Sequence, residues 1–501
     1  STDPAKSAFL MGPNASIQNL AIWYPEQAFV NGAPIPYPAT IKQEWIDGVT
    51  VRNVTFVNSY YGFDYTGSGI YALQYTRAIY GTFLHLGYRN DRSLDIGKLE
   101  NFHFSPDYWL QSGLPGTPDA ELLKTYMIRN AAGIIIERID WTYISDIYIE
   151  GYNIGLHARR SVGPDDYDGV TNGQVYNLNV TDSYTGMLME DVSWLILTGC
   201  NFSALGNSGA TALRFLSSCG SGPKNQPGDL CFIDSSFVSA GANAVFNCCN
   251  SAVTYTSCKL SSNSGNIIAN MTDAAQRILN SEVSGKSGGI ELLNDDTLPM
   301  TPEVDYTRDV VTKPKSQNYI NITEAPYNAK ENEDITAVLQ KAIDDLKATG
   351  GTVYIPSGIY YISAGIDVWA GIELRGAIIA PAYAHRVATG TKLYTSFGKN
   401  DPNGEALIDL YEGSGLFGIG IIYHEQKTSS LTPYSYSIRG KGSNVYVIDV
   451  SLSTSYNCID FASYKCDNHY VEFVWGLALK TGIKVGAGSE NGIIRDCHFT
   501  T

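Results

Sequence analysis

Five acidic side chains in the first half of the chain have types and positions from which a catalytic pair could be made: Glu137, Asp140, Asp165, Asp166 and Glu190. Hydrolysis of a glycosidic bond generally needs two carboxyl groups, one protonated as the general acid and one ionised as the base or nucleophile. The two groups need different pKa values and therefore different surroundings. We accordingly expect Glu137 or Asp140 to act with one of the three later acids.

Two tryptophans and two arginines from the same part of the chain are candidates for binding a substrate: Trp109, Trp141, Arg159 and Arg160. An indole ring can stack on a sugar ring, although the same side chain can equally serve as a core aromatic. Arginines beside aspartates also fit a second chemistry, in which a calcium-bound uronate loses its α-proton to a basic side chain. The stretch at 158–169, ARRSVGPDDYDG, contains both residue types.

Metal-binding patterns are weak in this sequence. Residues 163–169, GPDDYDG, have the spacing of a calcium loop but lack its downstream glutamate, so a calcium site and a solvated acidic turn are both open interpretations. None of the 7 histidines stands in a pattern such as His-Glu-x-x-His. We predict no metal site and no cofactor, with calcium as the one candidate ion.

The candidate residues fall in or beside two insertions, at 105–130 and 159–173, that have no counterpart in the shorter repeats further along the chain. Loops carried by a rigid scaffold are common places for ligand sites. Insertions also provide the unlike surroundings that a catalytic pair needs.

The scaffold is indicated by short repeated phrases, such as YNLNVTDSYTGMLM and IDSSFVSAGANAVF, each with a strand, a polar corner and a second strand. Apolar residues alternate with a period of two, whereas a helical repeat would place them three and four apart. The predicted fold class is all-β, a right-handed parallel β-helix. Cys200, Ser236 and Cys258 fall at the same place in their repeats, which favours stacked buried thiols over disulfide bonds.

A longer duplication relates two distant parts of the chain. NLAIWYPEQ at 19–27 and GIGIIYHEQ at 418–426 end in the same Tyr-x-Glu-Gln, and the strands around them also match, which indicates two tandem copies of the β-helix. Glu26 and Glu425 in these phrases could be catalytic, but two equivalent copies cannot supply unlike surroundings. We therefore interpret the phrase as a hydrogen-bonding device at a coil corner.

One segment breaks the strand pattern and predicts a helix. Apolar residues from Ile335 to Leu346 recur at helical spacing, and Gly350 and Gly351 end the helix before the strand TVYIP. A short amphipathic helix in front of the first coil can cover the open end of a stacked core. It is therefore predicted to cap the second β-helix.

This helix and the segment GGTVYIPSGIYYI, at 350–362, resemble the N-terminal start of pectate-lyase-superfamily proteins, which include polygalacturonase-like proteins and family 55 glycoside hydrolases. The chain reads KENED at 330–334, where those families usually read Gly-Asp-Gly-x-x-Asp-Asp. The resemblance implies a pectin-lyase-like β-helix and, for tandem copies as in family 55, a carbohydrate cleft at or near their junction.

Three parts are expected along the chain: a first β-helix at 1–305 without its N-terminal cap, a linker at 306–320, and the cap and first coils of a second β-helix at 321–501. The first copy starts in mid-coil and the second stops after its first coils. We therefore expect the natural protein to extend beyond both ends.

The formal net charge of -16 and a pI near 4.9 argue against a nucleic-acid partner, and no apolar run is long enough to span a membrane. With the resemblance, the expected function is that of a secreted glycoside hydrolase, extracellular or at the cell surface, acting on a β-glucan- or pectin-like polysaccharide or oligosaccharide. Two alternatives stay open: a calcium-dependent polysaccharide lyase and a non-catalytic β-helical surface or adhesion protein.

Overall fold

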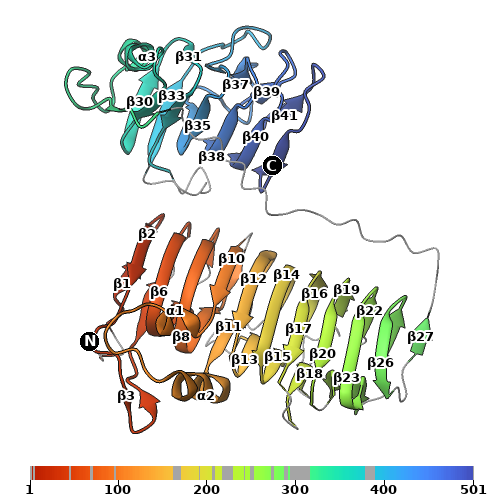
Figure 1. Ribbon diagram of the computed structural model, residues 1–501. Coiled ribbons are helices and arrows are strands. Elements are labelled where there is room, and N and C mark those ends of the chain that lie inside the picture. Colours follow the sequence, from red (N-terminus) through yellow and green to blue (C-terminus); the bar gives the residue numbers. More distant parts are fainter. Residues whose placement is uncertain are drawn as a thin grey trace. The chain divides into compact units, whose positions relative to one another are not determined.

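The structure is a computed structural model that describes residues 3, 6–43, 47–67, 71–94, 97–161, 171–190, 192–205, 209–216, 230–241, 243–248, 253–271, 276–286, 291–293, 316–378 and 390–499. Contacts within the chain divide it into two compact units, Ser1–Glu303 and Val304–Thr501 (Figure 1). Each unit is built mainly of parallel strands.

The first unit consists largely of one extended system of strands. These strands are β1 (Phe9–Met11), β2 (Ser16–Ile22), β5 (Ala39–Gln43), β6 (Thr50–Tyr65), β8 (Tyr75–Asn90), β10 (Lys98–Phe104), β11 (Ala132–Ile136), β12 (Thr142–Glu150), β13 (Ile154–Ala158), β14 (Thr171–Ser183), β15 (Thr185–Met189), β16 (Val192–Thr198), β17 (Asn201–Ala204), β18 (Thr211–Phe215), β19 (Leu230–Ile233), β20 (Ser236–Ser239), β21 (Val245–Asn247), β22 (Val253–Thr256), β23 (Lys259–Asn266), β24 (Ile268–Asn270), β25 (Gln276–Leu279), β26 (Glu282–Lys286) and β27 (Glu291–Leu293). Two short pairs lie outside this system: β3 (Phe29–Val30) with β4 (Ala33–Pro34), and β7 (Tyr71–Ala72) with β9 (Ser93–Leu94).

Strands of this unit pair in parallel with the equivalent strand one coil further along the chain, as Figure 1 shows from β2 to β27. In one such series β8 pairs with β11, β11 with β13, β13 with β15 and β15 with β18. Neighbouring strands of a sheet lie about 4.8 Å apart, so equivalent side chains stack at this spacing. The predicted parallel β-helix is confirmed.

The core of the first unit is a set of stacked apolar side chains. Val54, Ile79, Phe102, Ile147 and Leu178 follow one another in register on β6, β8, β10, β12 and β14, and all are fully buried. Alternate residues on each strand face outward. The period-two pattern of the sequence therefore sorts side chains between the core and the surface.

Several strands of this unit bend at a polar residue in the left-handed conformation, whereas β8 bends at Ala78. Asn53, Asn101, Asp146 and Asn177 have φ angles of 51°, 55°, 55° and 50° within β6, β10, β12 and β14. Asn and Asp tolerate this conformation because their short side chains can hydrogen-bond locally. Asn177 Nδ2 donates to Asp146 Oδ1 at 2.8 Å, across neighbouring coils. Residues before and after the bend consequently face different sides of the coil.

The cysteine ladder is present, with a correction of one residue. Asn201, Ser236 and Lys259 are in register, so the residue level with Cys200 and Cys258 is Ser235, not Ser236. Cys200 and Cys258 are buried free thiols, and burial raises the pKa of each to about 12. Thiols with such pKa values stay protonated and unreactive near neutral pH.

The insertion at 105–130 contains two helices, α1 (Asp107–Leu110) and α2 (Ala120–Asn130). Asp119 caps α2, because its Oδ1 accepts hydrogen bonds from the backbone N–H groups of Glu121 and Leu122. Leu123 and Met127 are fully buried on the inner face of α2. Both helices contact β8 (Figure 1). The insertion is thus a packed element.

Of the second insertion, residues 162–170 lie outside the described residues.

In each copy of the repeated Tyr-x-Glu-Gln phrase, the glutamine holds a loop. Gln27 Nε2 donates to the carbonyl oxygen of Ile35, and Gln27 Oε1 accepts from the N–H of the same residue, at 3.0 and 2.9 Å. Gln426 makes the equivalent two bonds with Thr432, at 2.7 and 2.9 Å. The phrase is therefore a structural clamp, used once in each unit.

The second unit has two sheets of parallel strands. One contains β28 (Tyr319–Asn321), β29 (Gly351–Tyr354), β30 (Gly358–Ile362), β32 (Ile372–Arg375), β33 (Thr391–Thr395), β35 (Gly415–Phe417), β36 (Ile419–Tyr423), β38 (Tyr446–Leu452), β40 (Tyr470–Gly476), β42 (Ile493–Arg495) and β43 (His498–Phe499). The other contains β31 (Ile366–Val368), β34 (Ile408–Leu410), β37 (Tyr436–Gly440), β39 (Asn457–Phe461) and β41 (Thr481–Val485), paired in that order.

The predicted capping helix is α3 (Thr336–Asp345), which confirms the prediction over 335–346 to within one residue at each end. Leu339, Ala342 and Ile343 are fully buried on its inner face, and α3 contacts β31 at the start of the unit (Figure 1). Of the linker expected at 306–320, residues 306–315 lie outside the described residues. Residues 319–321 form β28, which pairs with β29 inside the second unit.

Candidate functional site

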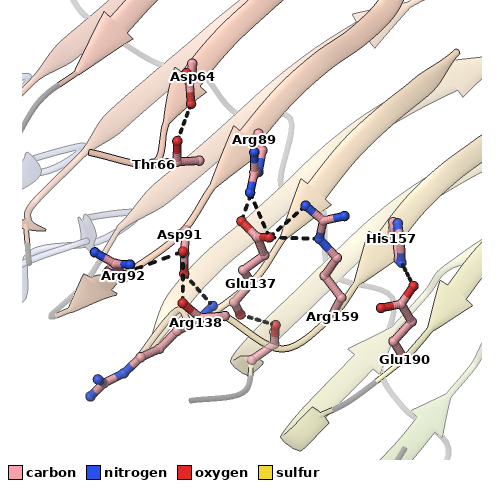
Figure 2. A network of polar contacts seen from close by, with 12 residues as sticks. Asp64, Thr66, Arg89, Asp91, Arg92, Glu137, Arg138, His157, Arg159 and Glu190 are labelled. Carbon is pink, nitrogen blue, oxygen red and sulfur yellow. Dashed lines mark hydrogen bonds and ion pairs between the residues drawn. The ribbon is translucent and has the colours of Figure 1, made fainter. Parts of the chain in front are cut away.

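Glu137, the first of the predicted acids, lies directly after β11 and is 3% exposed. Arg89 of β8 donates from Nε to Glu137 Oε2 and from Nη2 to Oε1, both at 3.0 Å. Arg159, one coil later, donates from Nε to the same Oε1 at 2.8 Å (Figure 2). Both carboxylate oxygens therefore accept charge-assisted hydrogen bonds, and the carboxylate fixes two guanidinium groups in place.

Glu190 stands at the equivalent corner two coils after Glu137. The backbone N–H of Arg159 donates to the carbonyl of Ile136, and that of Glu190 donates to the carbonyl of Ala158. The ladder of backbone bonds thus continues past the strand ends. The corner residues after β11, β13 and β15 are consequently Glu137, Arg159 and Glu190, so acidic, basic and acidic side chains follow one another. We call Arg89, Glu137, Arg159, His157 and Glu190 the charged corner.

His157 orients Glu190 within the charged corner. Its Nε2 lies 2.9 Å from Glu190 Oε1 (Figure 2). Burial lowers the pKa of His157, and this outweighs the opposite effect of the Glu190 charge. A neutral imidazole that donates from Nε2 fits this geometry. The Glu190 side chain is 35% exposed, so a ligand could reach it.

Asp140 and Trp141 lie beside the charged corner, in the turn between β11 and β12. Asn172 joins them, because its Nδ2 donates to Asp140 Oδ1 at 2.9 Å and its Oδ1 accepts the backbone N–H of Trp141 at 2.8 Å. Trp141 is 58% exposed. Its ring is therefore available for stacking against a ligand.

The other predicted residues lie elsewhere or are not described. Trp109 in α1 is fully buried and stacks on Phe29 with ring centroids 6.3 Å apart, so it belongs to the core and not to an exposed platform for a sugar ring. Arg160 is half-buried beside Arg159. Asp165 and Asp166 lie outside the described residues, as does the rest of the acidic GPDDYDG stretch.

A second group of acids, which sequence reasoning missed, lies in the second unit. Asp367 of β31 and Asp409 of β34 are directly opposite each other in register on neighbouring strands. On the next strand, β37, the residue in register with Asp409 is Arg439. Lys441 lies two residues after Arg439, and its Nζ is 2.7 Å from Asp409 Oδ2. Asp409 is 7% exposed, and its Oδ1 is buried without a hydrogen-bond partner. We call Asp367 and Asp409 the acid pair.

The two members of the acid pair have unlike surroundings. Burial raises the pKa of Asp409, the charge of Asp367 acts in the same direction, and together they outweigh the hydrogen bond and charge of Lys441 and the charge of Arg439. Asp367 is half-buried and accepts a hydrogen bond from Tyr411 Oη at 3.1 Å. An acid with a raised pKa beside a more accessible acid is the asymmetry that acid and base catalysis needs.

Aromatic rings surround the acid pair. Trp369 and Tyr411 each follow their strand two residues after an acid, and their ring centroids lie 4.7 Å apart. Lys441 Nζ lies 5.6 Å from the Tyr411 ring centroid and 6.0 Å from that of Tyr464, which is 47% exposed. Aromatic faces next to a few placed polar groups are typical of sugar sites.

A sequence signal for the acid pair does exist. The segments IDVW at 366–369, IDLY at 408–411 and IDF at 459–461 repeat an acid between the buried residues of a short strand, with IRGK at 438–441 at the equivalent place. A charged residue at the centre of successive apolar strands must face outward on a common ladder. The pattern becomes visible only when the coils are aligned.

Within the part of the chain that the structure describes, no three His, Cys, Asp or Glu side chains are grouped so that they could hold a metal ion. The helices among the same residues include none with both the length and the apolar character that crossing a membrane requires.

Residues 319–501 match the family model described as rhamnogalacturonase A/epimerase, pectate lyase-like. The matched range contains nearly all of the described second unit, including α3 and the acid pair. Together with the parallel coils, it confirms the resemblance to pectate-lyase-superfamily proteins that the capping helix and the GGTVYIP segment predicted. No curated protein matches the chain.

Proposed function

We propose that the chain is a carbohydrate-active enzyme, a glycoside hydrolase that cleaves a pectin-like polysaccharide by a two-carboxylate mechanism. The observation that carries this proposal is the acid pair, which lies in register on neighbouring strands inside the range that matches a pectate lyase-like family. The name of that family supports a polysaccharide of the pectin type. We further propose that the protein acts outside the cell or at its surface, where such a polysaccharide would be met.

The unlike surroundings of the two acids assign their roles. Asp409, whose pKa is raised by burial, protonates the glycosidic oxygen as the general acid. Asp367, which is more exposed than Asp409, acts as the base or nucleophile on the sugar. Neighbouring strands are about 4.8 Å apart, and the carboxyl groups of glycosidases are about 5 to 10 Å apart, so a pair one coil apart can flank a glycosidic bond.

The groups around the acid pair position the substrate. Tyr411 holds Asp367 through its hydroxyl group, and Lys441 holds Asp409 through its ammonium group. The exposed ring of Tyr464 provides a flat apolar surface for a sugar ring, whereas Trp369 packs against Tyr411 and Lys347 and helps to fix Tyr411.

In the first unit we assign the charged corner to binding. Arg159 is 29% exposed and is fixed by Glu137, so it presents an oriented guanidinium group to a uronate carboxylate. Arg160 and Trp141 are assigned the same role. The prediction that cleavage uses acids of the first unit stands beside this proposal as its rival, and those acids are Glu137, Asp140, Asp165, Asp166 and Glu190.

The proposal is tested by incubating the purified chain with pectin, polygalacturonate and β-glucans, with and without a chelator. We expect new reducing ends, no unsaturated sugar ends, and no effect of the chelator. Unsaturated products that disappear with chelator would instead identify a calcium-dependent lyase. Binding without any product would identify a non-catalytic surface or adhesion protein. A chain with Asp367→Asn and Asp409→Asn is the control for contaminating glycosidases.

A further inference from the structure

A row of aromatic side chains crosses the outer face of the first unit, away from the charged corner. Tyr80 of β8, His103 of β10 and Tyr148 of β12 are in register on neighbouring strands. Tyr108 of α1 lies against them, with its ring centroid 5.4 Å from that of His103 and 6.2 Å from that of Tyr80. Tyr148 is 45% exposed. We call these four residues the aromatic row.

Hydrogen bonds hold the rings of Tyr80, His103 and Tyr108 in place. Tyr108 Oη lies 2.9 Å from His103 Nδ1, and Asn101 Nδ2 donates to Tyr80 Oη at 3.1 Å. Burial raises the pKa of Tyr108 to about 12, so its hydroxyl group stays protonated. Rings that are already fixed lose little conformational freedom when a ligand binds.

A pocket of about 390 Å³ lies between α2, the ends of β12 and β14, and the residue that follows β17. Glu150 lines it, and stands two residues after Tyr148 on the same outer side of β12. Glu121 and Asp182 add two more carboxylates, and Lys124 and Arg129 add two positive charges. The lining therefore has more negative than positive groups.

The chemistry of the row and the pocket selects one class of ligand. Ring faces pack against the apolar faces of sugars, and carboxylate oxygens accept hydrogen bonds from sugar hydroxyl groups. With three carboxylates against two cations, the lining has a net negative charge, which disfavours a uronate relative to a neutral sugar. The rings repeat at the strand spacing of about 4.8 Å, which suits an extended chain lying across several coils.

We propose that the aromatic row and its pocket form a binding site for a neutral oligosaccharide. The site is made of residues other than the acid pair and does not depend on the catalytic role proposed for that pair. It would hold a neutral glycan while the acid pair acts on its own substrate.

The test is a titration of β-linked glucose oligosaccharides and of oligogalacturonides into the full chain, followed by calorimetry. We expect the neutral oligosaccharides to bind and Tyr148→Ala to weaken this binding by about two- to tenfold, because one stacked ring is lost. Tyr143→Ala is the matched control. Tyr143 is 40% exposed on the same strand but stands on the other side of the bend at Asp146, and its replacement should leave the affinity unchanged.

Two further arms make the result decisive. Binding should persist in the chain with Asp367→Asn and Asp409→Asn, because the row does not use these acids. The proposal is overturned if wild-type chain binds no neutral oligosaccharide, if Tyr148→Ala binds like wild type, or if oligogalacturonides bind more tightly in a manner that Tyr148→Ala abolishes. Loss of binding only in the Asp367 and Asp409 variant would place the ligand at the acid pair instead.

Discussion

Asp409 and Glu137 are both buried acids, but the charges around them differ. The carboxylate of Glu137 accepts hydrogen bonds from two arginines. In contrast, Asp409 pairs with one lysine through Oδ2, has a second acid one coil away, and has an Oδ1 without a hydrogen-bond partner. The two guanidinium groups hold the Glu137 side chain by charge-assisted hydrogen bonds, so it serves as an anchor. A carboxyl group with too few cations for its burial is easier to protonate. These differences lead us to place the general acid at Asp409.

The pH dependence of activity should report on Asp409. Its pKa is raised, so its protonated, acid-competent form persists above the ordinary value of about 3.9, and activity is lost as pH rises through the raised pKa. Lys441→Met removes a cation that favours the ionised form. We therefore expect this variant to shift the alkaline limb of kcat/KM to higher pH, by about one unit or more.

The control for this shift is Lys399→Met, since Lys399 pairs with Glu425 on the surface of the same unit. It should leave the profile in place. An alkaline limb that does not move in Lys441→Met, or that moves to lower pH, would remove Asp409 from the role of general acid.

At the scale of elements, α3 and the first coil behind it depend on each other. The helix has an apolar face of Leu339, Ala342 and Ile343, which is buried against the end of the second unit. The strands behind it would otherwise present apolar side chains to water. A helix of this length is marginal alone, so its stability comes from this packing.

Replacing Leu339 by Ala should therefore destabilise the start of the second unit by about 2–5 kcal/mol. Hydrogen exchange of peptides from 351–375 measures the loss directly. Lys341→Ala is the control, because the Lys341 side chain is 62% exposed and its surface ion pair with Asp345 contributes little to stability. Equal loss of protection in the two variants would mean that α3 does not cap the coil through its buried face.

Elements with a strong local pattern could be predicted from the sequence. The period-two strands and the apolar face of α3 are local signals, and both are confirmed. Register between coils is not local, because it depends on corner lengths. For that reason Ser236 was expected on the cysteine ladder where Ser235 stands, and the acid pair was missed although both acids are plain in the sequence. Trp109 is buried because Phe29, from a distant hairpin, packs on it.

At the scale of the whole molecule, both β-helical units stack equivalent side chains of successive coils into ladders, but the residue types in these ladders differ. In the first unit the corner ladder after β11, β13 and β15 carries Glu137, Arg159 and Glu190, and a separate face holds the aromatic row. In the second unit the outward ladder brings two acids together beside aromatic rings. The net charge of the chain is -16. We expect the local arrangements of charged and aromatic side chains, and not this overall charge, to determine which ligands bind. We accordingly propose that the second unit carries out cleavage and that the first unit binds the glycan.

The most direct test of this division is the turnover of amide variants made one at a time in the full chain, on whichever glycan of the panel it cleaves. Asp367→Asn and Asp409→Asn should each lower kcat by about 10²- to 10⁴-fold with the fold intact by circular dichroism. Glu137→Gln, Asp140→Asn, Asp165→Asn, Asp166→Asn and Glu190→Gln should act mainly on KM. If Asp367→Asn and Asp409→Asn keep wild-type turnover while two of the five first-unit variants lose it, cleavage takes place in the first unit and the account is contradicted.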